Sequence, residues 1–273
     1  MEKKVLQLLE FDKVKEQLLR HVSSLVGKEK VNDLQPYTRI EEVDQALEST
    51  DEGVSVLRLK GHVPLGGIRD IRASIKRAEI GGTLNIEELL DVANTIHAGR
   101  RLKAFVEETA QDDEIDIPIL TDLSQSIIPE KALEREIKRC IDEDGHVLDE
   151  ASESLRTIRS KLRSFEARIR EKLEAIVRSS TYQKMLSDTI VTIRNDRYVI
   201  PVKQEYRSSF QGMIHDQSAS GATLFIEPQS VVAINNQLRE AKVKERQEIE
   251  KILTQLSEAV ARSAANLMTN VKL

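Results

Sequence analysis

Apolar side chains recur every three or four positions through the first 140 residues, in short runs separated by turns that contain Gly or Pro. This period is that of an amphipathic helix. Helices are predicted over about 6–22, after Pro36, after the turn at 64–67 and from Asn85. Glu88 stands three residues after Asn85, which is the spacing of a capping box. We expect these short helices to pack as a small bundle.

A longer repeat begins after the acidic turn at 142–145. Apolar residues then recur every seven positions, with others three positions further on, which is coiled-coil spacing. The repeat consists of Leu148, Leu155, Leu162, Ile169 and Ile176, with Ala151, Ile158 and Phe165 between them. One helix over about 147–184 would be roughly 57 Å long at 1.5 Å per residue. That is longer than a small domain is wide, so we expect the helix to project as an arm.

Between about 189 and 226 the pattern changes to short β-branched and aromatic runs. Four strands are predicted, over 189–193, 198–202, 212–215 and 222–226. The polar pair Asn195-Asp196 indicates a hairpin turn between the first two strands, and 218–221 has turn chemistry between the last two. Pro201 has no N–H to donate, so we expect its strand to lie at a sheet edge or to contain a bulge there.

A second long helix is predicted from 229 to the end of the chain. Pro228 suits the first turn of a helix, and no Gly or Pro follows it. Apolar residues continue at helical steps from Ile234 to Leu267, with one slip in register. Two long helices joined by a compact sheet would run antiparallel. The chain ends at Leu273 inside the helical pattern without a stop signal, so we expect a parent protein that continues.

The sequence therefore predicts a mainly α protein. Its parts are a helical bundle core, a long antiparallel helical hairpin and a small antiparallel β-sheet at the tip of that hairpin. The expected boundaries are 1–145 for the core, 146–186 for the outgoing helix, 187–228 for the β tip and 229–273 for the returning helix.

Composition agrees with long helices and limits the class of protein. Gly and Pro number 11 and 6 in 273 residues, roughly half of their usual share. The single cysteine, Cys140, excludes an intramolecular disulfide and a multi-cysteine zinc site, and it favours a reducing compartment. No run approaches the roughly 18 apolar residues that a membrane span needs. We expect a cytoplasmic protein without a membrane partner.

The usual motifs of catalysis and metal binding are missing from the sequence. It contains no G-x-x-x-x-G-K-[ST] loop, no H-x-x-x-H pair and no G-x-S-x-G elbow. The acidic turn at 142–145 has its glycine fourth, whereas an EF-hand loop has it sixth. Cys140 is expected to be a buried small hydrophobe. We therefore predict no catalytic residue, no metal, no cofactor and no enzymatic activity for this chain by itself.

Positive charge is concentrated in one segment of an acidic chain. The chain carries 41 Lys and Arg against 46 Asp and Glu, a net charge of -5. Within 152–184, however, nine Lys and Arg stand against four Glu. Two interpretations stay open: a surface for polyanions, or the solvated flank of a coiled coil. In the second, the cations would pair with Glu240, Glu245, Glu248 and Glu250 of the returning helix.

The β tip holds the candidate contacts for nucleic acid. Its cations lie near Tyr198 and Tyr206, and such residues contact phosphates and stack on bases. Two serines of the turn at 218–221 could add hydroxyl and backbone N–H donors, although a plain hairpin turn explains them as well. The predicted nucleic-acid-binding residues are Arg194, Arg197, Lys203, Arg207, Ser218 and Ser220.

Four segments of the chain resemble the N-terminal half of a family of bacterial MutS-like paralogues, the MutSB branch. They are 9–14 (LEFDKV), 64–71 (PLGGIRDI), 192–203 (TIRNDRYVIPVK) and 214–228 (IHDQSASGATLFIEP), the last leading into Asn235-Asn236. The resemblance covers essentially the whole chain. It implies the core, lever and clamp regions of a MutS protein.

The resemblance also implies what the parent protein does. Members have an ABC-type ATPase, which uses ATP and Mg, and usually a C-terminal Smr endonuclease domain, and they form homodimers. They suppress homologous recombination through branched DNA, and they bind and split collided ribosomes. The partners implied for this region are thus DNA, ribosomal RNA or both. The alternative function is a purely structural coiled-coil arm that spaces or dimerises without a ligand of its own.

Overall fold

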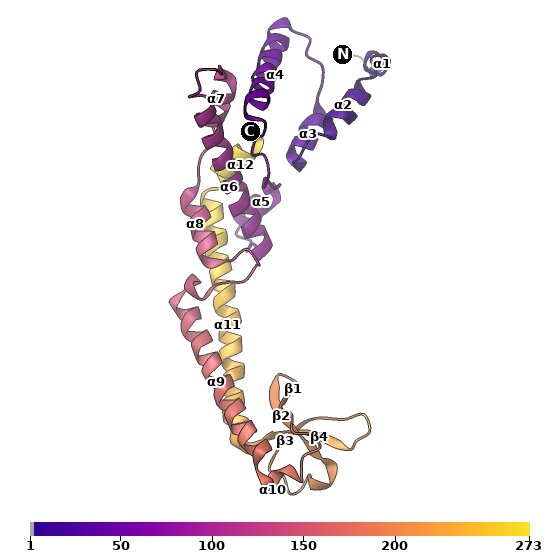
Figure 1. Ribbon diagram of the computed structural model, residues 1–273, viewed down its shortest axis with the longest axis vertical. Helices are drawn as coiled ribbons and strands as arrows, with labels where there is room; N and C mark the ends of the chain where they lie inside the picture. The colour runs from indigo at the N-terminus through magenta and orange to yellow at the C-terminus, as the bar shows by residue number, and fades with distance from the viewer. Residues whose placement is uncertain (1–2) are drawn as a thin grey trace. The chain divides into compact units, whose positions relative to one another are not determined.

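A computed structural model describes residues 3–273, so the first two residues of the predicted core lie outside the described range. The chain is mainly helical with one small antiparallel sheet, as the sequence predicts (Figure 1). It divides into two compact units. Unit 1 comprises Met1–Leu148 with Ile252–Leu273, and unit 2 comprises Asp149–Lys251. Within residues 3–273, no helix combines the length and the apolar character that crossing a membrane requires.

Unit 1 is built of helices. They are α1 (Lys3–Leu8), α2 (Phe11–Leu19), α3 (Leu25–Asp33), α4 (Ile40–Lys60), α5 (Arg72–Glu79), α6 (Ile86–Thr109), α7 (Pro118–Gln125), α8 (Lys131–Cys140) and α12 (Ala264–Lys272). The single helix predicted over 6–22 is wrong, because Glu10 adopts a left-handed conformation with φ of 53° and separates α1 from α2.

The predicted capping box at the start of α6 is confirmed. The Glu88 N–H donates to Asn85 Oδ1 at 2.9 Å, and the Asn85 N–H donates to Glu88 Oε2 at 2.8 Å. Residues from the end of the chain complete this unit. The Leu84 N–H donates to Ser257 Oγ at 2.8 Å, and the Ile128 N–H donates to Asn270 Oδ1 at 2.9 Å.

Unit 2 begins with the 3₁₀ helix η1 (Asp149–Ala151), followed by α9 (Glu153–Arg178) and α10 (Ser180–Gln183). The predicted helix over 147–184 is therefore too long. Ser152 caps the start of α9, since its Oγ accepts the Leu155 N–H at 3.0 Å. The helix ends at Ser179, whose backbone is extended. The buried face of α9 consists of Leu155, Leu162, Ile169, Leu173 and Val177. Seven-residue spacing thus holds as far as Ile169, and Ile176 is only half-buried.

The second long helix, α11 (Gln229–Arg262), runs antiparallel to α9 within unit 2, as predicted (Figure 1). Arg159 Nε donates to Glu245 Oε1 at 2.7 Å, and Ser152 Oγ donates to Glu248 Oε1 at 2.8 Å. The helix does not continue unbroken to the end of the chain. Ser263, with ψ of 6°, interrupts it before α12.

The strands of unit 2 are β1 (Thr192–Arg194), β2 (Arg197–Lys203), β3 (Gly212–Gln217) and β4 (Thr223–Pro228). They form one antiparallel sheet in the order β1-β2-β4-β3. Asn195 and Asp196 have φ of 50° and 59°, the left-handed pair that a two-residue hairpin turn requires. The predicted turn is confirmed. A 3₁₀ helix, η2 (Gln204–Tyr206), follows β2.

Of the two expectations for Pro201, the bulge is wrong, because β2 pairs regularly with β4 through Pro201. The edge position holds only locally: β2 lies inside the strand order, but β1 pairs with it only as far as Val199. Beyond it, Ser187 takes the place of a strand, and its N–H donates to the Pro201 carbonyl at 3.1 Å. The sheet does have a bulge, but it lies in β3, where His215 is the extra residue between Ile214 and Asp216.

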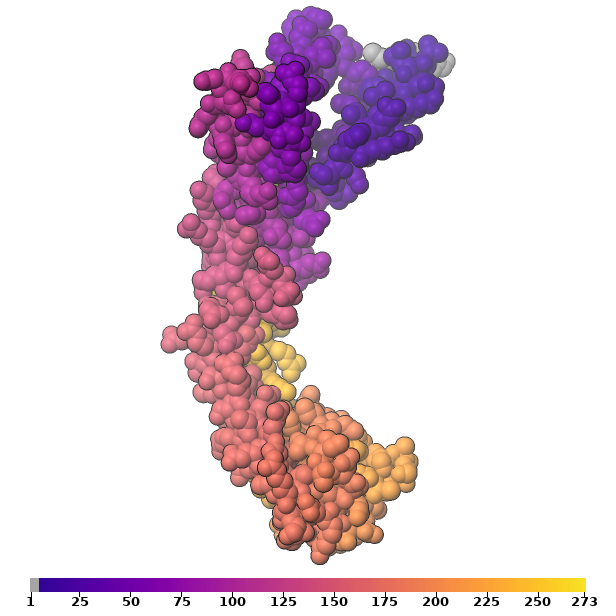
Figure 2. All heavy atoms as spheres, viewed as in Figure 1, coloured from indigo at the N-terminus to yellow at the C-terminus, as the bar shows by residue number. Residues whose placement is uncertain are grey.

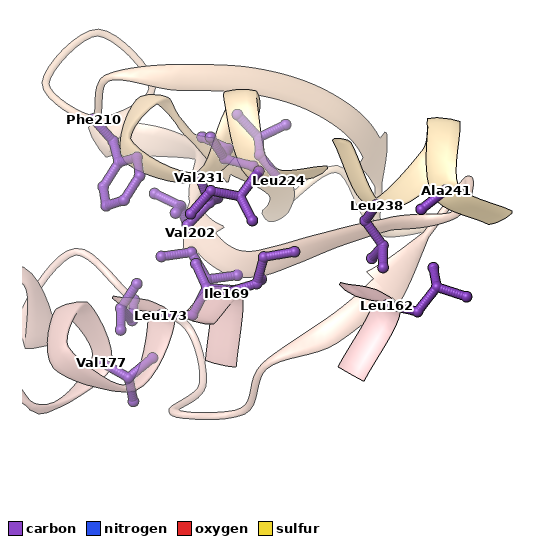
Figure 3. Packing of buried hydrophobic residues seen from close by; sticks show 14 residues of the cluster. Leu162, Ile169, Leu173, Val177, Val202, Phe210, Leu224, Val231, Leu238 and Ala241 are labelled. Carbon is purple, nitrogen blue, oxygen red and sulfur yellow. The ribbon is translucent and has the colours of Figure 1, made fainter. Parts of the chain in front are cut away.

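A hydrophobic core holds the sheet against α9 and α11 (Figure 3). It consists of Leu162, Ile169, Leu173, Val177, Leu186, Ile200, Val202, Phe210, Leu224, Ile226, Val231, Ile234, Leu238 and Ala241. Full burial of one such side chain stabilises a fold by about 1.5–3 kcal/mol. This core therefore fixes one face of the sheet and leaves the other to carry polar residues.

Candidate nucleic-acid interface

The outer face of the sheet brings together three of the predicted contacts. Ile200 and Val202 point into the core, so alternation along β2 places Arg197 and Lys203 on the opposite face. Arg194 lies directly opposite Arg197 in the pairing of β1 with β2. Residues paired in this way share a face of the sheet. All three side chains therefore start from the outer face.

Along the strands, however, the predicted residues separate into two groups. Arg197 and Lys203 stand at the two ends of β2, six residues and roughly 20 Å apart at about 3.3 Å per residue. The first group, the hairpin pair, is Arg194 and Arg197. The second group, which we call the turn group, is Lys203, Arg207, Ser218 and Ser220. The Gln204 N–H donates to the Ala222 carbonyl at 3.0 Å, which fixes the end of β2 beside the turn between β3 and β4.

Arg197 is engaged inside the protein. Its Nη1 donates to Glu227 Oε1 at 3.1 Å, and the two side chains are only 12% and 0% exposed. The other carboxylate oxygen, Oε2, lies 2.6 Å from His215 Nε2, and Asn235 Nδ2 donates to Oε1 at 2.7 Å. We call Arg197, His215, Glu227 and Asn235 the Glu227 cluster. It joins three strands to α11, so Arg197 has a structural task whatever else it contacts.

Asn235 also replaces a missing strand partner. The register of β2 with β4 pairs Ile200 with Ile226, so Tyr198 would stand opposite Pro228, which has no N–H. Asn235 Nδ2 donates instead to the Tyr198 carbonyl at 3.2 Å, and Asn235 Oδ1 accepts the Tyr198 N–H at 3.4 Å. Pro228 is the last residue of β4, not the first turn of the helix as the sequence suggests.

Arg194 crosses the outer face and is partly exposed. Its Nε lies 3.2 Å from Asp216 Oδ2, and its guanidinium carbon lies 4.3 Å from the centre of the Phe225 ring. The ring and the carboxylate hold the side chain in place. Because Asp216 is itself exposed, this pair adds little to stability and leaves part of the guanidinium open to solvent.

The cations of the turn group have no carboxylate partner among the described residues. Lys203 Nζ donates only to the Lys184 carbonyl at 3.1 Å, which leaves the other ammonium donors for a ligand. This contact also brings the exposed Lys184 beside Lys203. Arg207 follows η2 and is exposed. Three cationic residues, Lys184, Lys203 and Arg207, thus lie near one end of the sheet.

The two serines of the turn group differ. Ser218 Oγ accepts the Thr223 N–H at 3.0 Å, and the Ser218 carbonyl accepts the Gly221 N–H at 2.8 Å, so Ser218 closes the turn. Gly221 has φ of 74°, a conformation that favours glycine. Ser220 is exposed and lies 3.4 Å from Ser218 Oγ. The turn chemistry seen in the sequence therefore accounts for Ser218, and Ser220 stays available.

The two tyrosines beside these cations pack against the core of unit 2. Burial raises the pKa of Tyr198, the nearby Glu166 raises it further, and Arg170 opposes both. Neither ring is free to stack on a base.

The charge of the unit still favours an anionic partner. Asp149–Lys251 contains 18 Lys and Arg against 15 Asp and Glu, in a chain whose net charge is -5.

A cluster of possible metal ligands lies in unit 1, in the acidic turn noted in the sequence. Ligand atoms of Asp142, Asp144 and His146 lie within 4.8 Å of one another. Asp142 Oδ1 accepts the His146 N–H at 2.7 Å, and this hydrogen bond lowers the pKa of Asp142. The group thus stabilises its own turn, and we assign no metal to it.

Sequence reasoning missed the Glu227 cluster and the position of Lys184. Glu227 looks like the polar end of a strand, and no local pattern predicts that it is buried. A usable signal was the lone acid between the apolar run 224–226 and Pro228. In the sequence, Lys184 is one more cation of the predicted outgoing helix, since its contact with Lys203 depends on how the strands pair.

These features define a mainly α protein in which a small antiparallel sheet packs on two paired long helices. The chain is 59% identical to the endonuclease MutS2 of Halalkalibacterium halodurans over 268 residues, which cover 98% of this chain and 34% of that protein. It is 60% identical over 271 residues to the endonuclease MutS2 of a Geobacillus species and 54% identical over 268 to that of Shouchella clausii.

This similarity confirms the family resemblance found in the sequence. The chain spans about a third of the length of the curated relatives that it matches, since it covers 34% of each of the three. No protein-family model matches the chain.

Proposed function

We propose that the turn end of the sheet binds the phosphate backbone of nucleic acid. The observation that supports this function is the gathering of Lys184, Lys203 and Arg207, none of which has a carboxylate partner among the described residues. Lys and Arg side chains that are not neutralised within the protein are the usual phosphate contacts. Ser220, exposed in the adjoining turn, adds a hydroxyl.

The hairpin pair has a different role in this proposal. Arg197 holds Glu227 and positions the sheet, so its substitution would disturb the fold before it tested binding. Arg194 lies on the same face, but its Nε is paired with Asp216 and its Nη1 donates to the Ile193 carbonyl at 2.9 Å, which leaves Nη2 for a ligand. The proposal therefore rests on the turn group.

The role of the parent protein is proposed from its relatives. Several are named endonucleases, and we propose that this chain is the core, lever and clamp part of such an enzyme. ATP, Mg and the nuclease site would then belong to regions outside the 273 residues, and the parent would act as a homodimer. Suppression of recombination on branched DNA and splitting of collided ribosomes are the activities proposed for that parent.

The test is a double charge reversal, Lys203→Glu with Arg207→Glu, in the 273-residue chain. Fluorescence anisotropy with a labelled four-way DNA junction and a labelled RNA hairpin measures affinity between 50 and 200 mM KCl. Loss of two phosphate contacts should weaken binding at least about tenfold and reduce the slope of log K against log[salt] by about 1.8 on duplex DNA. The preferred ligand is the one that wild type binds more tightly.

The matched control is Arg246→Glu with Lys251→Glu, which makes the same charge change on exposed residues of α11. This control should keep both affinity and slope. Equal effects of the two double variants, or an unchanged affinity of the first, would refute the assignment. Self-association of wild type without affinity for either nucleic acid at low salt would favour the alternative, a purely structural coiled-coil arm.

A further inference from the structure

In the structure, some cations of α9 form ion pairs and others do not. Arg159 contacts Asp149 at 2.8 Å and Glu245 at 2.7 Å, and Arg163 contacts Asp149 at 3.3 Å. Arg178 contacts Glu174 at 3.2 Å. Part of the basic arm is therefore the solvated and paired flank that coiled coils usually have. The rest of its cations need a different explanation.

Four cations of α9 make no ion pair or hydrogen bond with any described residue, and all four are exposed. Three of them, Lys161, Arg168 and Lys172, share one side of the helix, and Arg156 lies off it. Steps of seven and four residues place the three on that side. The side continues in three- and four-residue steps through exposed Ser154, Thr157, Ser164 and Ala175. We call these seven residues the α9 strip.

The α9 strip contains no acid. Of the four glutamates of α9, Glu166 and Glu174 lie on other sides of the helix, whereas Glu153 and Glu171 border the strip, Glu171 three residues after Arg168. Three of them, Glu166, Glu171 and Glu174, line a groove on another side of the helix together with Arg163 and Arg170. The seven positions of the strip thus carry three cations and no acid, in a chain where acids outnumber bases. On α11, by contrast, acids and bases alternate.

The side chains between the cations are small. Serine and threonine at 154, 157 and 164, and alanine at 175, let a ligand approach the helix closely, and hydroxyls donate hydrogen bonds to phosphate oxygens. The three cations span 11 residues, about 16 Å of helix, and the whole strip spans about 31 Å. This length compares with one turn of B-DNA, about 34 Å. A regular, extended polyanion fits this surface better than a folded acidic peptide.

The strip runs along the part of α9 on whose apolar side the sheet packs. Lys172 precedes Leu173, and Arg168 precedes Ile169, and both of these apolar residues pack in the core cluster with Val202 and Leu224 (Figure 3). In Figure 2 the end of α9 and the sheet of unit 2 form one continuous body. The strip and the turn group therefore belong to the same unit.

We propose that the α9 strip is a second binding surface for the nucleic-acid backbone. Lys161, Arg168 and Lys172 contact successive phosphates, and Ser164 lies between them as a hydroxyl donor. The inference rests on the proposed function, because it extends the surface that begins at the turn group. It adds about three phosphate contacts, which residues of α9 make.

The test compares two triple variants of equal charge. In the strip variant, Lys161, Arg168 and Lys172 are replaced by Gln. In the control variant, Arg156, Arg246 and Lys251 are replaced by Gln; these are exposed cations of the same unit that lie off the strip. Both are titrated with a fluorescein-labelled 40-bp DNA duplex at 50–200 mM KCl, and circular dichroism verifies that each is folded.

The strip variant should bind at least about tenfold more weakly than wild type at 100 mM KCl, with a salt slope reduced by about 2.7. The control variant should change the slope by less than 1. If wild type binds but the strip variant keeps its slope, or if both variants lose equally, the inference is wrong while the proposed function stands. If wild type does not bind the duplex, the proposed function fails with it.

A cross-link tests the position of the ligand directly. The substitution Ser164→Cys introduces an exposed thiol on the strip for a photo-activatable label, and Glu166→Cys introduces one in the groove on another side of α9. Cys140 does not compete, since it is buried and burial raises the pKa of its thiol. The duplex should cross-link from position 164 and not from 166. Equal yields from both positions would overturn the assignment of this side of α9.

Discussion

Arg197 and Glu227, 30 residues apart in the chain, form an ion pair of 3.1 Å whose carboxylate is completely buried. His215 and Asn235 occupy the remaining positions around that carboxylate. A buried charge of this kind is tolerated only when its partners are complete. The pair thus ties β2 to β4, and through Asn235 to α11, and it keeps the outer face of the sheet in one arrangement.

The first prediction concerns the loss of this buried charge. Glu227→Gln leaves Arg197 without its counter-charge, so the free energy of unfolding should fall by about 3–5 kcal/mol. Guanidinium unfolding followed by tyrosine fluorescence measures this, because the chain has no Trp and three of its four Tyr lie in unit 2. Asp216→Asn, which breaks the exposed pair with Arg194, should change it by less than about 1 kcal/mol. Similar effects of the two variants would contradict the central role of Glu227.

The second prediction concerns the substitute strand partner. Asn235→Ala removes the donor to the Tyr198 carbonyl and to Glu227, and it should destabilise by about 1–3 kcal/mol. Asn235→Asp should destabilise more than Asn235→Ala, because a carboxylate would face the carboxylate of Glu227 at close range. The same unfolding experiment ranks the two variants. An aspartate variant that is as stable as the alanine variant would show that the amide is not a donor here.

The third prediction concerns the hairpin turn between β1 and β2. Asp196 has φ of 59°, and a glycine adopts this conformation without strain. Asp196→Gly should therefore stabilise the chain by about 0.5–1 kcal/mol. Asp196→Ala should destabilise it, because alanine tolerates positive φ less well than aspartate. Thermal unfolding by circular dichroism distinguishes these outcomes, and a stabilising alanine would contradict the turn assignment.

The fourth prediction concerns acid stability. Asp149 Oδ1 accepts from Arg159 Nη1 at 2.8 Å, and this hydrogen bond holds the pKa of Asp149 below its usual value, against burial and with help from Arg163. A lowered pKa means that the stabilisation is present above the ordinary aspartate pKa, about 4. It is lost as the pH falls through the lowered value.

Asp149→Asn should accordingly reduce the free energy of unfolding by about 1 kcal/mol at pH 7. The difference from wild type should shrink as the pH falls below about 4. Urea unfolding at a series of pH values measures both curves. Asp113→Asn, on an exposed aspartate, is the control and should change the free energy of unfolding by no more than about 0.5 kcal/mol at pH 7. A constant difference for Asp149→Asn would refute the linkage.

Residue types alone identify the candidate cations of the site, but not which of them are available to a ligand. Arg194, Arg197, Lys203 and Arg207 are equivalent as cations near aromatic residues, and nothing local distinguishes them. Folding gives Arg197 a buried carboxylate and leaves Lys203 without one. The same holds on α9, where Arg159 is paired and Lys161, two residues later, is not. Whether a cation is available depends on acids that lie far away in the sequence.

Local patterns determined the elements of this protein. The three-to-four-residue period, the Asn85–Glu88 capping box and the Asn195-Asp196 turn act between near neighbours, so they can be read directly from the chain. Tertiary structure decided where the long helices break, which strands are internal and which charges are neutralised. Those outcomes depend on pairs such as Arg159 with Glu245, 86 residues apart, because only packing brings such groups within hydrogen-bonding distance.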